Sequence, residues 1–200
     1  MDSEADDRTK ARQYRAWELI NSAINSTGDG GRQDALRDLK EDGVRLSYAP
    51  LNRAYLSKID LRGAHLWGAQ LEEADLSGAQ LDDAVLIQAN LKNAVLYKTE
   101  LRGSKLMQAE LQGKKTNMRQ AKLHGADLRG AKMHYADLRG AEFQGASLQG
   151  ANFTGSLTDG AHFEDSALRL GRFSSYRAWD AVFRPSRRHY QQGATRRSFW

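Results

Sequence analysis

Residues 64–83 read AHLWG, AQLEE, ADLSG and AQLDD, four consecutive units of the form Ala-x-Leu-x-x. The same unit runs in one phase from Val44 to Gly113 and in a second phase from Thr116 to Ser175. Only Lys114 and Lys115 fall between the two phases. A fixed internal period constrains a fold more strongly than any single residue does. The period of five therefore governs the interpretation of the whole chain.

The repeat contains one large and one small apolar position. Of the 26 unit centres, 19 are Leu, four are Phe, two are Met and one is Thr158, while the position two residues before the centre is Ala 18 times. A helix needs apolar spacings of three and four, and a half-buried strand needs alternation. Neither fits, so we expect a chain that turns a corner every five residues, with four corners closing a coil. The centre then fills a square tube, the Ala lies under its wall, and Gly at the fifth position, as in Gly68, suits the turn.

These units resemble the pentapeptide-repeat family, and the resemblance covers about two thirds of the chain. It implies an all-β solenoid, a right-handed quadrilateral β-helix with about 20 residues per coil over residues 44–175. With about 4.8 Å per coil, six and a half coils give a tube roughly 30 Å long. A solenoid of this kind contacts only its neighbouring coils and needs covered ends.

Residues 1–43 are predicted to form the N-terminal cap. Residues 1–7 are acidic and are expected to lie outside any helix, with Asp6 or Asp7 as the N-cap of a helix that reaches Asn25. A second helix is expected over 33–41, burying Ala35, Leu36 and Leu39 and stopping at Gly43. The resulting helical hairpin, familiar from bacterial members of the family, would cover the open first coil.

The C-terminal residues leave the repeat. Continuing the phase past Phe173 would put Tyr176 where the repeat has Ala, so we expect a short capping helix at 176–185 that ends at Pro185. Residues 186–200 show no periodicity and are expected to form a basic, flexible tail. A local irregularity is expected at Thr158.

Composition limits the possible functions. The chain has no Cys, which excludes disulfides, thiolate metal sites and Cys nucleophiles, and it contains no hydrolase or nucleotide-binding fingerprint. The His residues are too far apart on the predicted faces to share a metal ion. The carboxylates alternate with Arg or Lys, which is typical of solvated surface charge. We therefore expect no enzyme activity, cofactor or metal and, since no apolar run spans a membrane and no signal segment appears, a cytoplasmic location.

Two sets of residues are candidate binding sites. Trp67, Ile87 and Met107 are spaced by 20 and 20 residues, so they should stack on one outward column, with Val85 and His65 beside it. Either a partner or the chain's own termini could cover this ladder, and a weaker one is expected on the opposite face at Tyr55, Val95 and Tyr97. The second set is basic and would bind anions: Arg187, Arg188, Arg196 and Arg197.

Three functions fit these features. The first is a non-catalytic scaffold or protein-interaction module whose partner is another protein or a second copy of the chain. The second is DNA mimicry that protects gyrase, which the resemblance suggests, but the repeats carry 15 bases and 14 acids over residues 44–168 and lack a continuous negative field. The third is weak binding of nucleic acid or an anionic surface by the tail, where residues 169–200 carry eight Arg and one acid.

The two residues between the repeat phases, Lys114 and Lys115, are expected to form either a solvated bulge at a corner or a basic contact with a partner.

Overall fold

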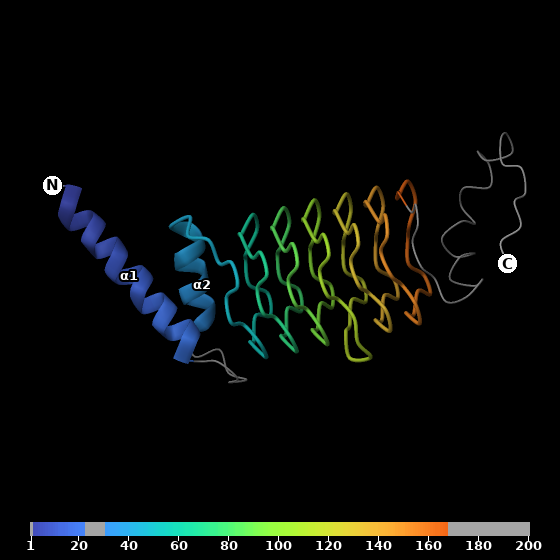
Figure 1. Cartoon of the computed structure of the whole chain (residues 1–200), viewed down its shortest axis with the longest axis horizontal. Coiled ribbons are helices and arrows are strands. Elements are labelled where there is room, and N and C mark those ends of the chain that lie inside the picture. The colour runs from blue at the N-terminus through green and yellow to red at the C-terminus, as the bar shows by residue number, and fades with distance from the viewer. Residues whose placement is uncertain (1, 23–30, 168–200) are drawn as a thin grey trace, which may run out of the picture.

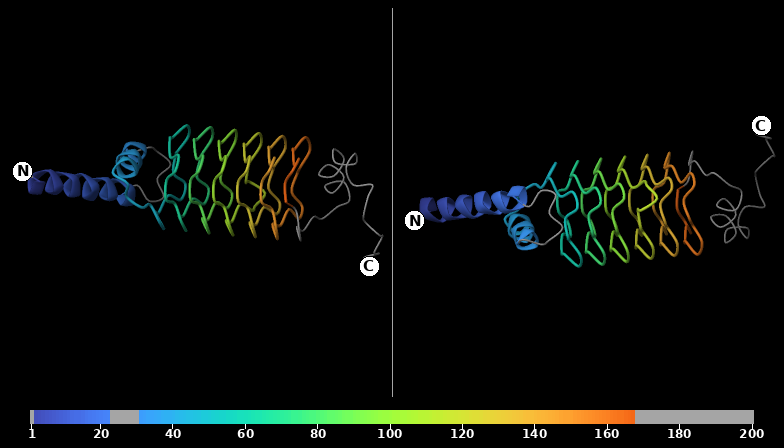
Figure 2. Two further views of the ribbon diagram at one scale, coloured as in Figure 1. Left: turned by 90° about the horizontal axis from the view of Figure 1, so that it is seen from above. Right: turned by 90° about the horizontal axis from the view of Figure 1, so that it is seen from below.

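The computed structural model describes residues 2–22 and 31–167, which form two helices followed by a stack of coils (Figure 1). Helix α1 spans Asp2–Ser22 and helix α2 spans Arg32–Glu41. The coils follow one another along a straight axis, and three views show the same regular stack (Figures 1 and 2). The predicted helix at 176–185, the tail and the last repeats lie outside the described residues.

Each coil has four sides, and each side pairs with the next coil through one parallel β-bridge. Bridged residues are 20 apart, as in His65 with Val85, and 22 apart where a coil includes Lys114 and Lys115, as in Lys105 with Asp127. The bridges define four faces of the tube. In order along the tube they include His65, Val85, Lys105, Asp127 and Ser147 on the first face, Gln70, Asn90, Glu110 and Lys132 on the second, Asp75, Val95, Asn117 and Asp137 on the third, and Gln80, Glu100, Lys122 and Glu142 on the fourth.

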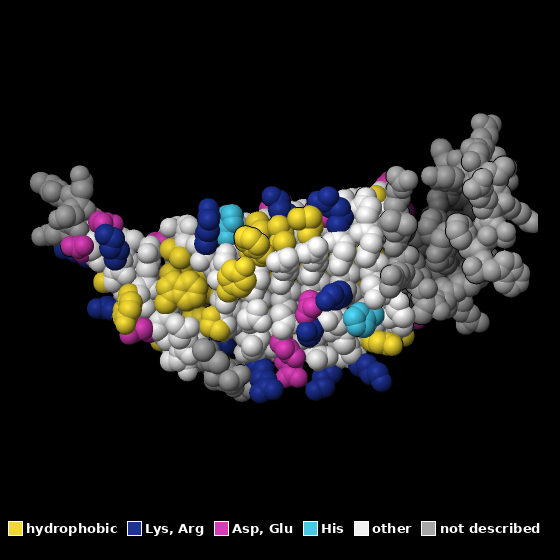
Figure 3. All heavy atoms as spheres, in the orientation of Figure 1, with side chains coloured by type: hydrophobic (Ala, Val, Ile, Leu, Met, Phe, Trp, Pro, Cys, Tyr) yellow, Lys and Arg dark blue, Asp and Glu magenta, His cyan; other side chains and the backbone are white. Residues whose placement is uncertain are grey.

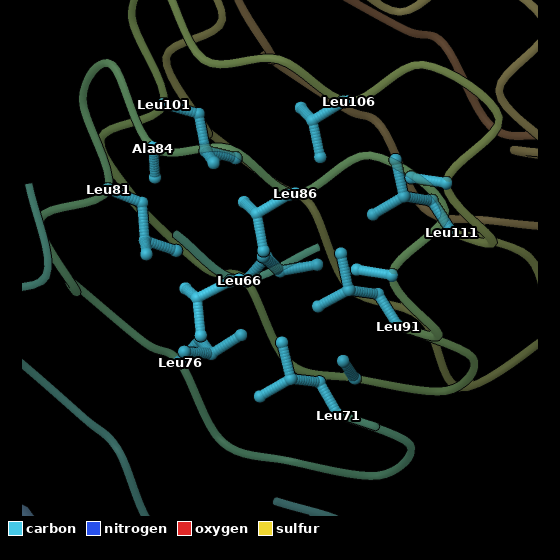
Figure 4. Packing of buried hydrophobic residues seen from close by; sticks show 14 of the residues in the cluster. Leu66, Leu71, Leu76, Leu81, Ala84, Leu86, Leu91, Leu101, Leu106 and Leu111 are labelled. Atoms are coloured by element: carbon cyan, nitrogen blue, oxygen red, sulfur yellow. The ribbon is translucent and has the colours of Figure 1, made fainter. Parts of the chain in front are cut away.

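The interior is a continuous column of the large and small repeat residues. Leu side chains from successive sides meet at the axis of the tube (Figure 4), and Leu86 and Ala84 are both fully buried. Toward the C-terminal end the filling changes to aromatic rings. Phe143 stacks on Phe163 with ring centroids 4.8 Å apart, and Phe153 meets both rings edge-on from the opposite side. The two-in-five apolar pattern therefore supplies a complete core in spite of the low mean hydropathy of −0.70.

The corner of each unit has a left-handed backbone at the fifth position whether or not that residue is Gly. Tyr48 has φ of 58° and Tyr135 has φ of 61°, in a region that L residues rarely adopt. Gly is needed where an aromatic corner residue lies on the preceding coil. A Cβ at Gly68 would lie 2.5 Å from the ring of Tyr48, and one at Gly155 would lie 2.6 Å from the ring of Tyr135.

The inserted lysines are accommodated by one buried hydroxyl. Thr116 occupies a small position at the insertion and is fully buried. Its Oγ1 accepts a hydrogen bond from the backbone N–H of Asn93 and donates one to the carbonyl of Gln112, both at 2.9 Å. Beyond the bulge the coil spacing returns to 20 residues. The insertion therefore widens one corner without breaking the stack.

Helix α2 covers the N-terminal end of the tube. Leu36 and Leu39 are fully buried and belong to the same apolar cluster as Leu46 in the first coil. The backbone N–H of Val44 donates to the carbonyl of Leu39 at 2.8 Å, which joins the helix end directly to the tube. The predicted burial of Ala35, Leu36 and Leu39 is therefore present, and α2 covers this end of the tube.

Helix α1 packs only its C-terminal half and projects beyond the tube (Figure 1). Ala16 and Ile20 are buried, and Gln13 donates to the carboxylate of Asp42 at 3.3 Å. The expectation that the first seven residues lie outside the helix is wrong for residues 2–7, since α1 begins at Asp2. Asp6 and Asp7 therefore lie inside the helix, and neither is its N-cap. Acidic residues near a helix N-terminus interact favourably with the helix dipole, and Asp6 also pairs with Lys10 one turn later.

The irregularity expected at Thr158 is also absent. Thr158 is buried, and its carbonyl accepts a hydrogen bond from the N–H of Ala161 at 3.0 Å, as the other unit centres do in their turns. A Thr side chain is small enough to enter the interior beside the Phe rings. The repeat phase thus continues unbroken to the end of the described residues.

Aspartate and arginine pairs brace the outer surface of several coils. In three units Asp at the second position accepts two hydrogen bonds from the guanidinium of the Arg two residues later. The carboxylate of Asp127, for example, accepts hydrogen bonds from the Arg129 guanidinium at 2.8 and 2.7 Å. It also accepts one from the backbone N–H of Arg129 at 3.3 Å. These bonds lower the pKa values of the three carboxyl groups. The pairs are Asp60 with Arg62, Asp127 with Arg129 and Asp137 with Arg139.

We predict that Leu86→Asp destabilises the tube by more than about 4 kcal/mol, because it removes a packed side chain and buries a carboxylate without a partner. Gln88→Asp makes the same charge change two residues away, on the exposed corner, and should cost no more than about 1 kcal/mol. Urea unfolding measured by circular dichroism compares the two. Equal midpoints would contradict the assignment of inward and outward positions.

We predict a loss of stability in acid that traces to the aspartate and arginine pairs. A carboxyl group whose pKa is lower in the folded state stabilises the fold above its unfolded pKa of about 3.9, and this contribution disappears as the pH falls below that value. The urea midpoint of the wild type should therefore drop between pH 6 and about pH 2.5. The double variant Asp127→Asn and Asp137→Asn should lose less over the same range.

The control for this experiment is Asp83→Asn, which changes an exposed corner carboxyl outside the three pairs. Its acid dependence should match that of the wild type. A double variant that is as acid-sensitive as the wild type would show that these pairs do not carry the effect.

Candidate functional site

The first face carries an outward column of apolar side chains. Trp67, Ile87 and Met107 lie on three consecutive coils at the position after the buried centre. The coils are joined beside them by the N–H of Gly68, which donates to the carbonyl of Ile87, and the N–H of Gln88, which donates to the carbonyl of Met107, both at 2.9 Å. Val85 lies in the bridge column of the same face, and it is partly exposed, as are Ile87 and Met107. We call Trp67, Val85, Ile87 and Met107 the first-face ladder.

Tyr48 extends the ladder by one coil toward the N-terminus. Its ring centroid lies 6.2 Å from that of Trp67, and its side chain remains 63% exposed. The described helices leave Trp67 46% exposed, so they do not cover the ladder. Figure 3 shows hydrophobic side chains gathered over the N-terminal helices and along the adjoining coils. Sequence reasoning missed Tyr48, although the Gly at position 68, one coil later in the same corner, was a usable signal.

One margin of the ladder is a row of uncharged amides. The indole N–H of Trp67 donates to Oε1 of Gln88 at 3.2 Å, and Nε2 of Gln88 donates to Oε1 of Gln108 at 2.9 Å. These side chains lie on successive corners, so the row follows the axis of the tube. It fixes the orientation of the exposed Trp67 ring and leaves other amide atoms available for hydrogen bonds.

The other margin is basic. Arg45, His65 and Lys105 occupy the second position of their units on the first face, and all three are exposed. At the C-terminal end of the ladder, Nη2 of Arg129 lies 3.0 Å from the sulfur of Met107 while the same guanidinium binds Asp127. Lys105 adds a smaller contribution to the lowered pKa of Asp127. The first face therefore combines an apolar column with positive charge along one side.

The second and fourth faces alternate acids with bases. On the second face, the carboxylate of Glu110 lies 2.6 Å from Lys92 and 2.7 Å from Lys132, and these two ammonium groups lower its pKa. On the fourth face, Glu100 pairs with Arg102 and with Lys122, the latter at 2.8 Å. Arg102 also lies 3.6 Å from Asp82. Alternating ion pairs leave no extended field of either sign on these faces.

The His residues and carboxylates do not assemble a reactive site among the described residues. His124 lies 3.3 Å from Glu142, and His162 lies 3.5 Å from Glu164, each as a separate pair. The described part of the chain holds no group of three or more potential metal ligands. Within the same residues, neither helix is long and apolar enough to cross a membrane.

The remaining candidate residues lie either on the third face or in the C-terminal part of the chain that the structure does not describe. On the third face Tyr55 is 46% exposed, and Tyr97 contacts Gln120 on the next coil at 3.4 Å and Lys98 through its ring. Lys115 reaches Glu73 at 4.0 Å, which places the inserted lysines beside the second face. The four anion-binding candidates lie outside the described residues: Arg187, Arg188, Arg196 and Arg197.

The known structures that resemble this chain are pentapeptide-repeat proteins. One from the thylakoid lumen of Arabidopsis thaliana is 28% identical, with a TM-score of 0.24. The matched region covers 56% of this chain and 62% of that protein. HetL from Nostoc sp. strain PCC 7120, which is involved in heterocyst differentiation regulation, is 28% identical over 62% of this chain and 72% of its own, with a TM-score of 0.22. QnrB1, a plasmid-mediated fluoroquinolone resistance protein, is 20% identical over 67% of each chain, with a TM-score of 0.31.

Among curated protein sequences, none matches this chain. The family model for pentapeptide repeats matches it with eight copies, at residues 42–78, 74–113 and 114–145. These matches cover more than half of the chain and coincide with the coils that the structure describes. The chain therefore belongs to the pentapeptide-repeat family.

Proposed function

We propose that this chain is a non-catalytic interaction module that binds another protein through the first face. The observation that carries the proposal is the exposed column formed by Tyr48 and the first-face ladder. Exposed apolar side chains that adjoin one another along a surface are typical of contact sites. Aromatic residues and Met, which make up most of this column, are enriched in protein interfaces.

The rigidity of the tube supports this role. The coils that present Trp67, Ile87 and Met107 are joined by backbone hydrogen bonds, and their buried centres are packed on every side. A surface that is already ordered loses little conformational entropy when a partner binds. The hydrogen bond from Trp67 to Gln88 orders the largest side chain of the column in the same way.

The surface charges favour this function over DNA mimicry. A mimic needs a continuous negative field along the tube. Here Glu110 lies between two lysines and Glu100 is paired with two bases, so the charges of these two carboxylates are neutralised locally. Weak binding of anionic polymers by residues 186–200 remains the alternative that the sequence suggests, and it would not involve the first face.

We predict that the double variant Trp67→Asp and Ile87→Asp loses partner proteins that the wild type retains. Tagged full-length chains would be compared by affinity capture from a cell extract, with the retained proteins identified by mass spectrometry. Tyr97→Asp is the matched control, because Tyr97 occupies the same outward position on the opposite side of the same coil as Ile87.

The expected result is a set of proteins common to the wild type and the control and missing from the double variant. Identical retained sets for all three chains would contradict a binding role for the first face. A set that is lost at high salt and unaffected by the double variant would favour anion binding by the tail instead.

A further inference from the structure

We infer that the first face binds an amphipathic α-helix that lies along the axis of the tube and carries acidic residues near both of its ends. This inference rests on the proposed function and specifies the partner for the same surface. Three properties of the face support it: the spacing of its coils, the placement of its charges and the difference between its two margins.

The coil spacing matches the pitch of a helix. The coils stack at about 4.8 Å, and an α-helix advances about 5.4 Å per turn, so a helix along the axis offers roughly one side chain to each coil. Residues spaced by three or four on one helix face would meet Trp67, Ile87 and Met107 in turn. Over these two intervals the mismatch accumulates to only about 1 Å.

An extended strand matches the same column poorly. Side chains on one face of a strand recur at about 6.7 Å, which departs from the coil spacing by about 2 Å at every step. A strand running along the axis would therefore meet one coil well and miss the next. A strand running across the axis would contact only one or two side chains of the column.

The exposed charges determine which helix fits. Arg45 and Lys105 lie three coils apart in the basic margin. Their separation of about 14 Å corresponds to about ten residues of helix. Between them the margin holds His65 and Val85, and the exposed Asp83 lies at the corner that precedes Val85. Acidic residues on the partner are therefore favoured near the ends of the bound helix and disfavoured at its middle.

The opposite margin has no formal charge on the same coils. The amides of Gln88 and Gln108 form a hydrogen-bonded row there. A bound helix would thus place acids along one edge of its apolar stripe and uncharged polar residues along the other. This asymmetry also determines which edge of the bound helix faces each margin of the first face.

A second copy of this chain is a poorer occupant. In a symmetric pair the same patch contacts itself. An antiparallel arrangement centred between Trp67 and Ile87, the midpoint of the column that begins at Tyr48, would set the Arg45 of each copy toward the Lys105 of the other. Like charges at an interface oppose association. In the register that matches the apolar columns of the two copies, the same two residues that attract an acidic helix therefore oppose self-association.

The test is a selection of binding peptides. A display library of random peptides about 20 residues long would be selected on the full chain and depleted on Ile87→Asp, with binding to Tyr97→Asp required. The library length covers about 30 Å as a helix, enough to span the column and both basic residues. Selected peptides would then be synthesised and their affinities measured for each chain by fluorescence anisotropy.

We expect the selected sequences to share apolar residues at i, i+3 or i+4, and i+7, with two acids about ten residues apart. Ile87→Asp should weaken their binding by about tenfold or more, and so should the charge-reversed pair Arg45→Glu and Lys105→Glu. Tyr97→Asp should leave the affinity within about twofold of wild type. Circular dichroism should show that the peptides gain helicity on binding.

Three results would overturn the inference. Ile87-dependent peptides that are basic, or that bind without gaining helicity, would reject the acidic helix and leave the first face as a docking surface of another kind. Self-association of the full chain that Ile87→Asp abolishes, seen by sedimentation, would identify a second copy as the occupant. Failure to select any Ile87-dependent peptide would reject the helix inference, while the affinity capture described above separately tests the proposed function.

Discussion

The parallel hydrogen bonding of each coil to the next is the interaction on which the rest of the structure depends. The N–H of Leu66 donates to Val85 in the next coil at 2.8 Å, and the N–H of Val85 donates back to Ala64 at 2.9 Å. This reciprocal pattern continues along all four faces and fixes the coil spacing. Because each side contributes a single bridge, no coil is stable without its neighbours, and the Leu and Ala interior provides the apolar burial that holds the bridges together.

This constraint turns the outward positions into straight columns whose chemistry can vary independently of the core. On the second and fourth faces the columns carry alternating ion pairs, such as Glu110 between Lys92 and Lys132. On the first face the same geometry places Trp67, Ile87 and Met107 in line. A regular core therefore explains how one chain can combine neutralised charged faces with one apolar face suited to binding.

Most of this arrangement could be predicted from the sequence, because a period of five assigns every residue to a face and to the inside or outside. The stacking of Trp67 over Ile87 follows from a 20-residue spacing alone. The details that escaped prediction depend on contacts between coils. Tyr48 joins the apolar column because the corner at Gly68 leaves room for its ring. Thr116 sustains the fold at the lysine insertion through hydrogen bonds to Asn93 and Gln112, which no periodicity reveals.

The ends were harder to predict than the middle, because helices obey different rules from the repeat. The acidic residues after Met1 looked too polar to fold, yet they suit the first turns of α1, whose helix dipole favours negative charge. Helix α2 was easier, since Leu36 and Leu39 have a clear helical spacing. For the candidate site, the column could be predicted but its exposure could not, since exposure depends on where the N-terminal helices lie.

The claim that rigid, evenly spaced coils carry the outward columns is tested most directly by spin-label distances. The chain has no Cys, so two introduced cysteines are the only labelling sites. Labels at Ser47 and Gln149, five coil spacings apart on the first face, should give a narrow distance distribution for backbones separated by about 24 Å. Moving the second label to Arg129 should shorten the mean by about 5 Å, one coil. A broad distribution, or a mean that fails to shift by one coil, would contradict the account.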